Sequence, residues 1–316
     1  MTGEELTARQ AWTLNQKIDH SVGTIEAFIS RTGKIPYVAF SGGKDSTVLL
    51  DLCRRFVKSD IKGVFVNTGN EYPEIVKFVR TVDNVVVISP ACKVSDVLAN
   101  YGFPLVSKET ALKIRQVKNT QSEKLIKIRM VGTGKGTFGV IPEKWKFLIK
   151  APFDVSEKCC YILKKRPSRE YERNTGEVPV IGTMAAESRA RRTLYLRRNG
   201  CNVFEGKHCA SYPLSIWTEA DIWQYIKRYN IPICELYRDK QCQRTGCMFC
   251  GFGAHLDKGK RFEMLYRLHP ALYRKMMAYK NNDVTYRQAL RAIGVPLPDE
   301  VRQLYLFDEK EIDGEC

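Results

Sequence analysis

Six consecutive residues, Ser41-Gly-Gly-Lys-Asp-Ser46, have the composition of a phosphate-binding loop. Their two glycines let the backbone approach an anion closely, and backbone N–H groups at the start of a helix can hold a phosphate. Lys44 adds a positive charge, and the serine hydroxyls can donate further hydrogen bonds. The spacing differs from the G-x-x-x-x-G-K-[ST] loop of kinases and GTPases. We therefore predict a phosphate site of another type.

Cysteines are the second group of residues that could do chemistry, and the chain has 11 of them. A chain of 316 residues can bury a full core, so metal, cluster or thiol chemistry explains them better than a disulfide framework. Cys159-Cys160 and Cys247-Met-Phe-Cys250 offer four thiolates, which can serve zinc, redox exchange or an iron–sulfur cluster. Cys242 can replace one of the paired cysteines, and the sequence leaves this choice open.

Three arginines, Arg189, Arg191 and Arg192, follow the apolar run Val178-Pro-Val-Ile-Gly182. Open parallel sheets bind ligands at the carboxyl ends of their strands, and Arg forms bidentate contacts with phosphate or sulfate. We therefore expect these arginines to hold the phosphates or the sulfate of a substrate.

The elements that position these residues alternate between strands and helices. We predict strands at residues 35–40, 61–66, 84–89 and 178–182, and helices at residues 10–29, 74–82, 94–101 and 218–229. Continuous β-branched runs between helices indicate a parallel sheet that is covered on both faces. The predicted fold is α/β, a Rossmann-like doubly wound parallel sheet with a Cys-rich, helical C-terminal extension.

These patterns divide the chain into three parts. We predict an N-terminal helix at residues 1–30, the sheet domain at residues 31–230 and a Cys-rich basic region at residues 231–316. No apolar run approaches the roughly 18 residues of a membrane span, and the first residues lack the order of a signal peptide. We therefore expect a cytoplasmic protein.

The charge of the chain suggests a polyanionic partner. Lys and Arg outnumber Asp and Glu by 51 to 35, for a net charge of +16. Cations that neutralise phosphates release counterions, which favours nucleic-acid binding. A strongly basic stretch lies between Ser107 and Trp145, and Gly132-Thr-Gly-Lys-Gly-Thr137 within it is expected to form a mobile link. A basic solubilising surface would account for the same composition.

Several motifs resemble those of known families. Ser41-Gly-Gly-Lys-Asp-Ser46 matches at all six positions the pyrophosphate loop of the N-type ATP pyrophosphatases, the PP-loop superfamily. Asn67-Thr-Gly-Asn-Glu-Tyr-Pro-Glu74 resembles the Asp-Thr-Gly-x-x-[Phe/Tyr]-Pro-Glu segment of the phosphoadenylyl-sulfate (PAPS) reductase family, with Asn67 in place of Asp. Ile231-Pro-Ile-Cys-Glu-Leu-Tyr237 also looks like that family. The chain is thus identified as a member of the PAPS reductase family.

The resemblance implies cofactors and site residues. A Cys-Cys dipeptide with a distant Cys-x-x-Cys resembles the arrangement that holds a [4Fe-4S] cluster in adenylyl-sulfate reductases, which implies Cys159, Cys160, Cys247 and Cys250 as ligands, with zinc as the alternative metal. ATP and Mg²⁺ are the other implied cofactors, and Lys44, Asp45 and Arg191 are the implied catalytic residues. The residues implied in nucleotide binding are Ser41, Gly42, Gly43, Lys44, Asp45, Ser46, Thr68, Gly69, Glu187 and Arg192.

The layout of loop and cysteines most resembles the ATP-pyrophosphatase components of DNA phosphorothioation systems. The implied function is adenylation of a nucleic-acid oxygen for sulfur insertion, with DNA favoured over tRNA, a cysteine desulfurase or other sulfur donor as partner, and a homodimer left open. The alternative is an assimilatory sulfonucleotide (APS/PAPS) reductase that uses thioredoxin and Cys316, although Glu315-Cys316 lacks the family's Gly-x-His continuation. A third possibility is a nucleic-acid-binding subunit with a degenerate nucleotide site, against which the intact loop counts.

Overall fold

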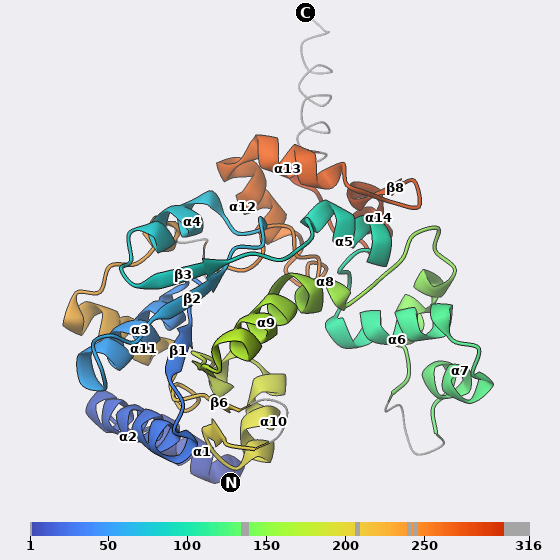
Figure 1. The fold of residues 1–316 in the computed structure, drawn as a ribbon. Helices are drawn as coiled ribbons and strands as arrows, with labels where there is room; N and C mark the ends of the chain where they lie inside the picture. The colour runs from blue at the N-terminus through green and yellow to red at the C-terminus, as the bar shows by residue number, and fades with distance from the viewer. Residues whose placement is uncertain (1, 134–138, 206–208, 239–241, 243–244, 300–316) are drawn as a thin grey trace, which may run out of the picture. The chain divides into compact units, whose positions relative to one another are not determined.

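The computed structural model describes residues 2–133, 139–205, 209–238, 242 and 245–299 (Figure 1). The chain forms two compact units, and each unit is built from segments that are not consecutive in the sequence. Unit 1 comprises Met1–Asn67, Tyr72–Ser89 and Arg166–Thr245, and unit 2 comprises Thr68–Glu71, Pro90–Lys165 and Gly246–Cys316. The division at residues 30 and 230 follows the order of the chain instead, and it stays a prediction.

Unit 1 contains a six-stranded sheet with the strand order β3-β2-β1-β4-β6-β5. Its strands are β1 (Pro36–Ala39), β2 (Gly63–Val66), β3 (Val85–Ile88), β4 (Val178–Val180), β5 (Asn202–Val203) and β6 (Ala210–Ser211). Neighbouring strands pair in parallel except for β5, which is antiparallel to β6. The register places Val38 opposite both Gly63 and Val180. The predicted Rossmann-like parallel sheet is confirmed, with β5 as the antiparallel exception.

The strand order creates a switch point between β1 and β4. From β1 the chain winds through β2 to β3, and it later returns to β4 on the opposite side of β1. Open α/β sheets bind ligands outside the carboxyl ends of their strands at such a point. The loop that begins at Ser41 leaves β1 here, and the segment that leads to Glu187 leaves β4 here.

Helices cover the sheet of unit 1. They are α1 (Gly3–Gln10), α2 (Leu14–Thr32), α3 (Lys44–Phe56), α4 (Pro73–Arg80), α9 (Arg166–Thr175), α10 (Arg189–Arg198) and α11 (Glu219–Tyr229), with the short turns η3 (Ala185–Glu187) and η4 (Glu235–Arg238). Helices α2, α3 and α11 pack against one another, and the fully buried Trp217 donates a hydrogen bond of 2.9 Å to Ser21 Oγ on α2. On β1, Tyr37 faces α9 and donates to Glu172 at 2.9 Å.

The helix predicted over residues 10–29 is wrong at its start. The structure has two helices there, because the chain leaves the helix after Gln10 and Thr13 begins a new one. The Thr13 side chain accepts from the N–H of Gln16, and the Gln16 side chain accepts from the N–H of Thr13. This capping box, Thr-x-x-Gln, is a strong start signal.

Unit 2 is mainly helical among its described residues. Its elements are α5 (Val94–Tyr101), α6 (Lys108–Asn119), α7 (Glu123–Met130), η1 (Glu143–Ile149), α8 (Lys158–Cys160), the π-helical turn η2 (Tyr161–Lys165), α12 (Lys260–Leu268), α13 (Pro270–Met277), the strand pair β7 (Lys280–Asn281) and β8 (Val284–Thr285), and α14 (Tyr286–Ala292). The rings of Phe103, Phe249 and Tyr286 form its buried centre. The predicted helical C-terminal region is confirmed.

The basic stretch of the sequence corresponds to α6, α7 and η1 of unit 2. Most of the predicted mobile link falls on residues 134–138, which lie outside the described residues. Among the helices that the structure describes, none combines the length and the apolar character needed to cross a bilayer.

Candidate functional site

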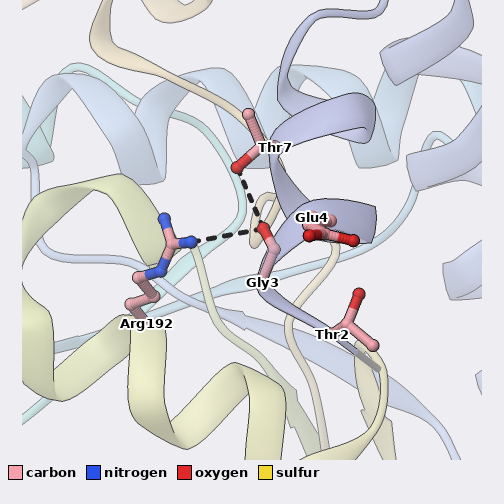
Figure 2. A pocket seen from close by; sticks show the side chains of 5 residues that line it. All are labelled: Thr2, Gly3, Glu4, Thr7 and Arg192. Atoms are coloured by element: carbon pink, nitrogen blue, oxygen red, sulfur yellow. Dashed lines mark hydrogen bonds between the residues drawn. The ribbon is translucent and has the colours of Figure 1, made fainter.

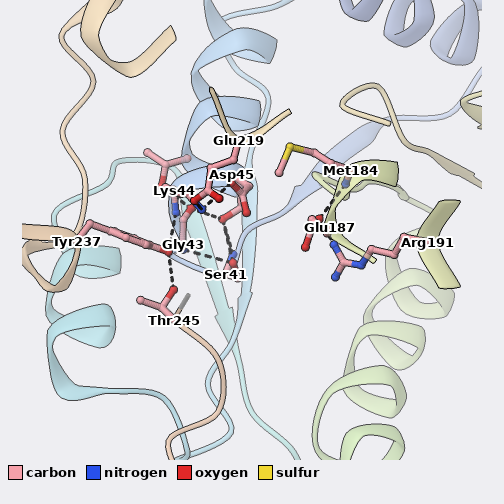
Figure 3. Close-up of polar contacts among 12 residues, drawn as sticks. Ser41, Gly43, Lys44, Asp45, Met184, Glu187, Arg191, Glu219, Tyr237 and Thr245 are labelled. Carbon is pink, nitrogen blue, oxygen red and sulfur yellow. Dashed lines mark hydrogen bonds and ion pairs between the residues drawn. The ribbon is translucent and has the colours of Figure 1, made fainter. Parts of the chain in front are cut away.

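The loop between β1 and α3 is held by hydrogen bonds within the chain (Figure 3). The N–H of Ser41 donates to Ser46 Oγ at 3.1 Å, and that hydroxyl donates to the carbonyl of Gly43 at 2.9 Å. Thr47 Oγ1 donates to the same carbonyl at 3.0 Å. The predicted phosphate loop is therefore preorganised by the first turn of α3.

Gly42 is required by the conformation of this loop. Its φ is 70°, in the left-handed region that favours glycine. A Cβ at this position would lie 2.9 Å from side-chain carbons of Ile75 and Val79 on α4. Any larger residue would strain the backbone and displace α4, so the loop is closed by steric fit as well as by hydrogen bonds.

Lys44 stands at the start of α3 with only 4% of its side chain exposed. Its Nζ lies 3.4 Å from Asp45 Oδ1 and 3.3 Å from Glu219 Oε1 (Figure 3). Burial acts to lower the pKa of Lys44, but the two carboxylates outweigh it and raise that pKa. The lysine is therefore a fixed positive charge at the mouth of the loop.

Asp45, next to Lys44, lies among other carboxylates. Burial raises the pKa of Asp45, Lys44 opposes the shift, and the charges of Glu187 and Glu219 add to it. Three carboxylates thus share the region beside the loop with two cations, the buried ammonium of Lys44 and the guanidinium of Arg191. An excess of negative charge next to an anion site is unfavourable unless a cation joins it.

Two hydroxyls from the end of unit 1 cover the loop. The N–H of Lys44 donates to Tyr237 Oη at 3.1 Å, and Thr245 Oγ1 lies 2.7 Å from that oxygen. A Cβ at Gly43 would meet both hydroxyls at 3.1 Å. The sequence patterns predict no role for Tyr237 or Thr245, although Tyr237 belongs to a segment that resembles the family.

Glu187 and Arg191 come from the segment after β4. Their side chains form an ion pair, and Glu187 Oε1 also accepts from the N–H of Met184 at 2.9 Å (Figure 3). Ser188 caps α10 by accepting from the N–H of Arg191, so Arg191 lies in the first turn of this helix, which begins at Arg189. Glu187 acts electrostatically on Asp45, which places these residues beside the phosphate loop.

Arg192 is directed elsewhere. Its guanidinium donates to the carbonyl of Gly3 at 3.2 Å and borders a surface hollow of about 700 Å³ lined by Thr2, Gly3, Glu4, Thr7 and Arg192 (Figure 2). The structure therefore does not place Arg192 with Lys44 and Asp45, and its predicted role in nucleotide binding stays a prediction.

Thr68 and Gly69 belong to unit 2, in the turn Thr68–Glu71. The N–H and the hydroxyl of Thr68 both donate to the Glu71 carboxylate at 2.9 Å, and Gly69 has a φ of 73°. The turn is well formed, and the nucleotide-binding role of these two residues also stays a prediction.

The structure gathers the four predicted cysteine ligands in unit 2. Burial raises the pKa of Cys159, and the thiols of Cys160, Cys247 and Cys250 raise it further. Burial also raises the pKa of Cys250 to about 11, with Cys247 and Cys160 contributing. The two cysteine pairs are far apart in the sequence, yet their thiols influence one another's pKa, so both pairs lie in the same region of unit 2.

Cationic groups surround the cysteines. Lys164 lies on the π-helical turn after Cys160, and its Nζ is 3.2 Å from Glu71 Oε1. Burial lowers the pKa of Lys164, but Cys247 and Glu71 outweigh it and raise that pKa. Arg261 donates to the carbonyls of Cys250 and Phe252, both at 2.9 Å. Lys164 was not predicted; its position four residues after Cys160 is the sequence signal.

The turn around Cys250 is packed closely. A Cβ at Gly251 would lie 2.6 Å from both the carbonyl of Pro104 and Tyr286 Oη, and Tyr286 donates to the carbonyl of Phe249 at 2.6 Å. In the described part of the chain, no group of three or more His, Cys, Asp or Glu side chains is already arranged to hold a metal ion. Cys242 is buried in unit 1, and Cys316 lies outside the described residues.

A parallel sheet with a phosphate loop at its switch point defines an α/β nucleotide-binding enzyme. The chain belongs to the PAPS reductase family, because the model of the phosphoadenosine phosphosulfate reductase domain matches residues 35–132 and 108–251. The family and the PP-loop motif together give a nucleotide-binding enzyme of this group.

Several proteins are similar to this chain. An uncharacterized protein of Methanocaldococcus jannaschii is 26% identical over 234 residues, which cover 73% of this chain but only 39% of that protein. Sulfate adenylyltransferase subunit 2 of Bacteroides fragilis is 54% identical over 39 residues, 12% of this chain and 13% of that protein. The chain thus spans well under half of either relative. A crystal structure of PAPS reductase from Candida auris in a phosphate complex has 14% identity and a TM-score of 0.42 over 78% of this chain and 96% of that chain.

Proposed function

We propose that the protein is an ATP pyrophosphatase that adenylates a nucleic-acid oxygen so that sulfur can replace it. The observation that carries this proposal is the preorganised loop at the switch point, with the buried Lys44 at its mouth. Backbone N–H groups and a lysine at a helix start suit the β and γ phosphates of a nucleotide.

The carboxylates beside the loop favour Mg²⁺-ATP over a lone sulfate or phosphate. Asp45, Glu187 and Glu219 would repel a bare anion, whereas the same carboxylates would attract a divalent cation that accompanies the phosphates of a nucleotide. The raised pKa of Asp45, caused first by burial, is the mark of a charge that lacks enough compensation. Oxygen donors of this kind fit Mg²⁺, which when bound would neutralise phosphate charge.

The proposed reaction is an in-line displacement at the α-phosphorus of ATP. The acceptor oxygen forms a bond to this phosphorus, the bond to the bridging oxygen of the β-phosphate breaks, and pyrophosphate leaves with the electron pair. Lys44 and the loop N–H groups hold the leaving pyrophosphate, and Arg191 binds the charge on the α-phosphate after exchanging its Glu187 partner. A sulfur nucleophile at the sulfide level then attacks the activated acceptor atom, and AMP leaves with the former acceptor oxygen and the electron pair. Where a cysteine desulfurase delivers the sulfur as a persulfide, a thiol reductant must afterwards cleave the S–S bond.

We further propose that Cys159, Cys160, Cys247 and Cys250 hold a [4Fe-4S] cluster. The donor set fits, since four neighbouring thiols are the usual ligands of such a cluster and Lys164 would offset the negative charge of thiolates. A bound cluster would supply redox or sulfur-carrying capacity. Zinc with the same ligands is the alternative, and Cys242 as a substitute ligand stays open.

Unit 2 supports a nucleic-acid acceptor. Residues 108–150 contain 11 Lys and Arg but only 3 Asp and Glu, half of the chain's net positive charge. On helix α7, which has no buried residue, Lys124 and Lys127 are exposed, and Phe147 on η1 of the same unit is 48% exposed. Exposed cations mixed with an aromatic ring suit a phosphate backbone. DNA is the favoured acceptor, and tRNA, which has the same kind of phosphate backbone, is the alternative.

The test is pyrophosphate release from Mg²⁺-ATP by anaerobically purified protein, alone, with duplex DNA and with bulk tRNA. We expect release that one nucleic acid stimulates, and loss of that release in Lys44→Ala. The matched control is Lys58→Ala, because Lys58 lies just beyond the opposite end of α3 and is 68% exposed. Full activity in Lys44→Ala would refute the assigned role.

The cluster is tested separately by iron content and visible absorbance. We expect Cys247→Ser to lose both, whereas Cys92→Ser, a partly exposed thiol of unit 2 with no assigned role, keeps them. If the purified wild-type protein contains zinc and no iron, the cluster proposal is refuted and zinc is the metal at these cysteines.

An assimilatory sulfonucleotide reductase is the second candidate, favoured by the neighbouring cysteine pairs. It predicts sulfite release from adenylyl sulfate or PAPS with reduced thioredoxin, and no need for ATP. Cys316→Ser should abolish this activity and leave pyrophosphate release unchanged. Sulfite formation without pyrophosphate release would replace the first proposal with this one.

A further inference from the structure

The phosphate loop is covered by two hydroxyls of its own chain. Tyr237 Oη accepts from the N–H of Lys44 at 3.1 Å and lies 2.7 Å from Thr245 Oγ1. Both oxygens would be 3.1 Å from a Cβ at Gly43, so they press directly on the backbone of the loop (Figure 3).

These hydroxyls occupy the place that an anion would take. Lys44 is the first residue of α3, and its N-cap Gly43 has no side chain to accept from the free N–H groups of the first turn. A phosphate oxygen at a helix start binds such N–H groups, and one N–H makes only one strong linear hydrogen bond. Tyr237 Oη and a phosphate oxygen therefore compete for the same donor.

The tyrosine is held in this position from several sides. Burial raises the pKa of Tyr237, so its hydroxyl remains a neutral hydrogen-bonding group at physiological pH. Lys44 Nζ lies 5.7 Å from the centre of its ring, and the ring of Trp223 packs edge-on at 6.3 Å. None of these contacts is a covalent or deeply buried constraint, since Tyr237 is only half-buried.

We propose that Tyr237 and Thr245 form a gate that closes the phosphate loop and that the phosphates of the nucleotide displace. The proposal rests on the proposed nucleotide site and adds regulation to it. A site that must first open binds its ligand more weakly by the fraction of molecules that are open. The gate therefore lowers the affinity for free nucleotide, and removing the hydroxyl of Tyr237 opens the loop.

The test compares Tyr237→Phe with wild type in calorimetric titrations of inorganic pyrophosphate and of Mg²⁺-ATP. We expect roughly five-fold tighter binding in the variant, because a hydrogen bond of this kind contributes about 1 kcal/mol. Tyr229→Phe is the matched control, since Tyr229 packs on Phe56 at the far end of α3. Equal or weaker binding in Tyr237→Phe would overturn the gate, and weaker binding would make Tyr237 a phosphate ligand.

Trp223 provides a second readout. Displacement of Tyr237 removes the ring that packs on Trp223, so pyrophosphate should change the tryptophan emission of wild type but not of Trp223→Phe. An unchanged emission with pyrophosphate bound would show that the gate stays closed and would overturn the proposal.

Tighter binding in Tyr237→Phe without any pyrophosphate release from ATP would support the gate and refute the adenylating function. A protein that binds neither ligand, in wild type or variant, refutes both.

Discussion

The phosphate loop of unit 1 and the cysteine site of unit 2 differ in how far the protein alone completes them. The loop is one continuous segment whose hydroxyl and backbone groups satisfy one another, as in the bonds between Ser41, Ser46 and Gly43. The cysteine site brings together two segments, and burial leaves its thiols with a raised pKa, as at Cys159. The phosphate loop is thus preformed, whereas the cysteine thiols lie in one region but are not yet arranged as ligands of a metal ion.

The difference shows what local sequence can and cannot build. A loop at a strand end is positioned mainly by its two flanking elements, and here Gly42 also fits closely against α4. Buried thiols near one another are stable when protonated, and they become ligands only when a metal takes their protons. We therefore expect the loop to depend on steric fit and the cysteine site to depend on metal.

The largest expected effect is that of Gly42→Ala. A Cβ at this left-handed position would lie 2.9 Å from Ile75 and Val79, so the loop cannot keep its shape. We expect pyrophosphate release to fall by about 100-fold or more, as for misplacement of groups that bind the transition state. Gly23→Ala is the control, because a Cβ at Gly23 in α2 meets nothing within 4 Å. A Gly42→Ala variant of near-normal activity would show that the loop is not preformed.

If the proposed cluster is present, removal of its iron should affect the cysteine site and leave the phosphate loop unchanged. We expect chelation to reduce amide hydrogen-exchange protection around residues 156–164 and 246–252, because metal binding and local folding are coupled. Protection at residues 41–47 should not change, since that loop is held by hydrogen bonds of its own. Equal loss at both places would contradict the difference between them.

The same difference explains how much the sequence predicts. The strand Val85–Ile88 is nearly continuous Val, and the helix after Thr218 begins with a Thr-x-x-Asp capping box, so local rules find both. The phosphate loop is likewise a local motif between a strand and a helix. Sequence position alone also indicates that residues following β4 reach the ligand edge of the sheet.

Contacts between residues far apart in the sequence cannot be predicted from such local motifs. Tyr237 reaches Lys44 across 193 positions of the chain, and no spacing rule connects them. Arg192 follows Arg191 directly, yet the turn of α10 directs it to Gly3 instead of Glu187. The two units alternate along the chain, whereas the predicted boundaries at residues 30 and 230 follow chain order.

A smaller effect concerns the free energy of unfolding, which the burial of the Asp45 carboxylate beside the loop reduces. Burial, then Glu187, raises the pKa of Asp45 above its unfolded value near 3.8, so the folded state binds the proton more strongly. The stability that this proton contributes is present at low pH and is lost as pH rises through the folded pKa. Asp45→Asn removes the buried charge, so we expect its Tm at pH 7 to exceed that of wild type by about 2–4 °C.

The gain from Asp45→Asn should shrink as the pH falls through the raised pKa of Asp45, because Asp45 of the wild type is then itself protonated. Pyrophosphate release should be lost in the same variant, which separates stability from function at the loop. Asp60→Asn is the control, because Asp60 is 67% exposed and lies near the end of α3 opposite the loop. A lower Tm for Asp45→Asn at pH 7 would show that its ion pair with Lys44 outweighs the cost of burial.

The smallest effect concerns the basic surface of unit 2, which we propose binds the nucleic-acid acceptor, whereas the phosphate loop of unit 1 binds ATP. Lys124 and Lys127 are exposed on α7. If each neutralises one phosphate, reversing both charges reduces the slope of log affinity against log salt for duplex DNA by about 2. Fluorescence anisotropy over a salt series measures this slope, with Lys58→Glu/Lys227→Glu on unit 1 as the control of equal charge. Equal slopes in the two variants would place the nucleic acid elsewhere, whereas ATP binding should be the same in both, because the phosphate loop holds its shape without unit 2's basic surface.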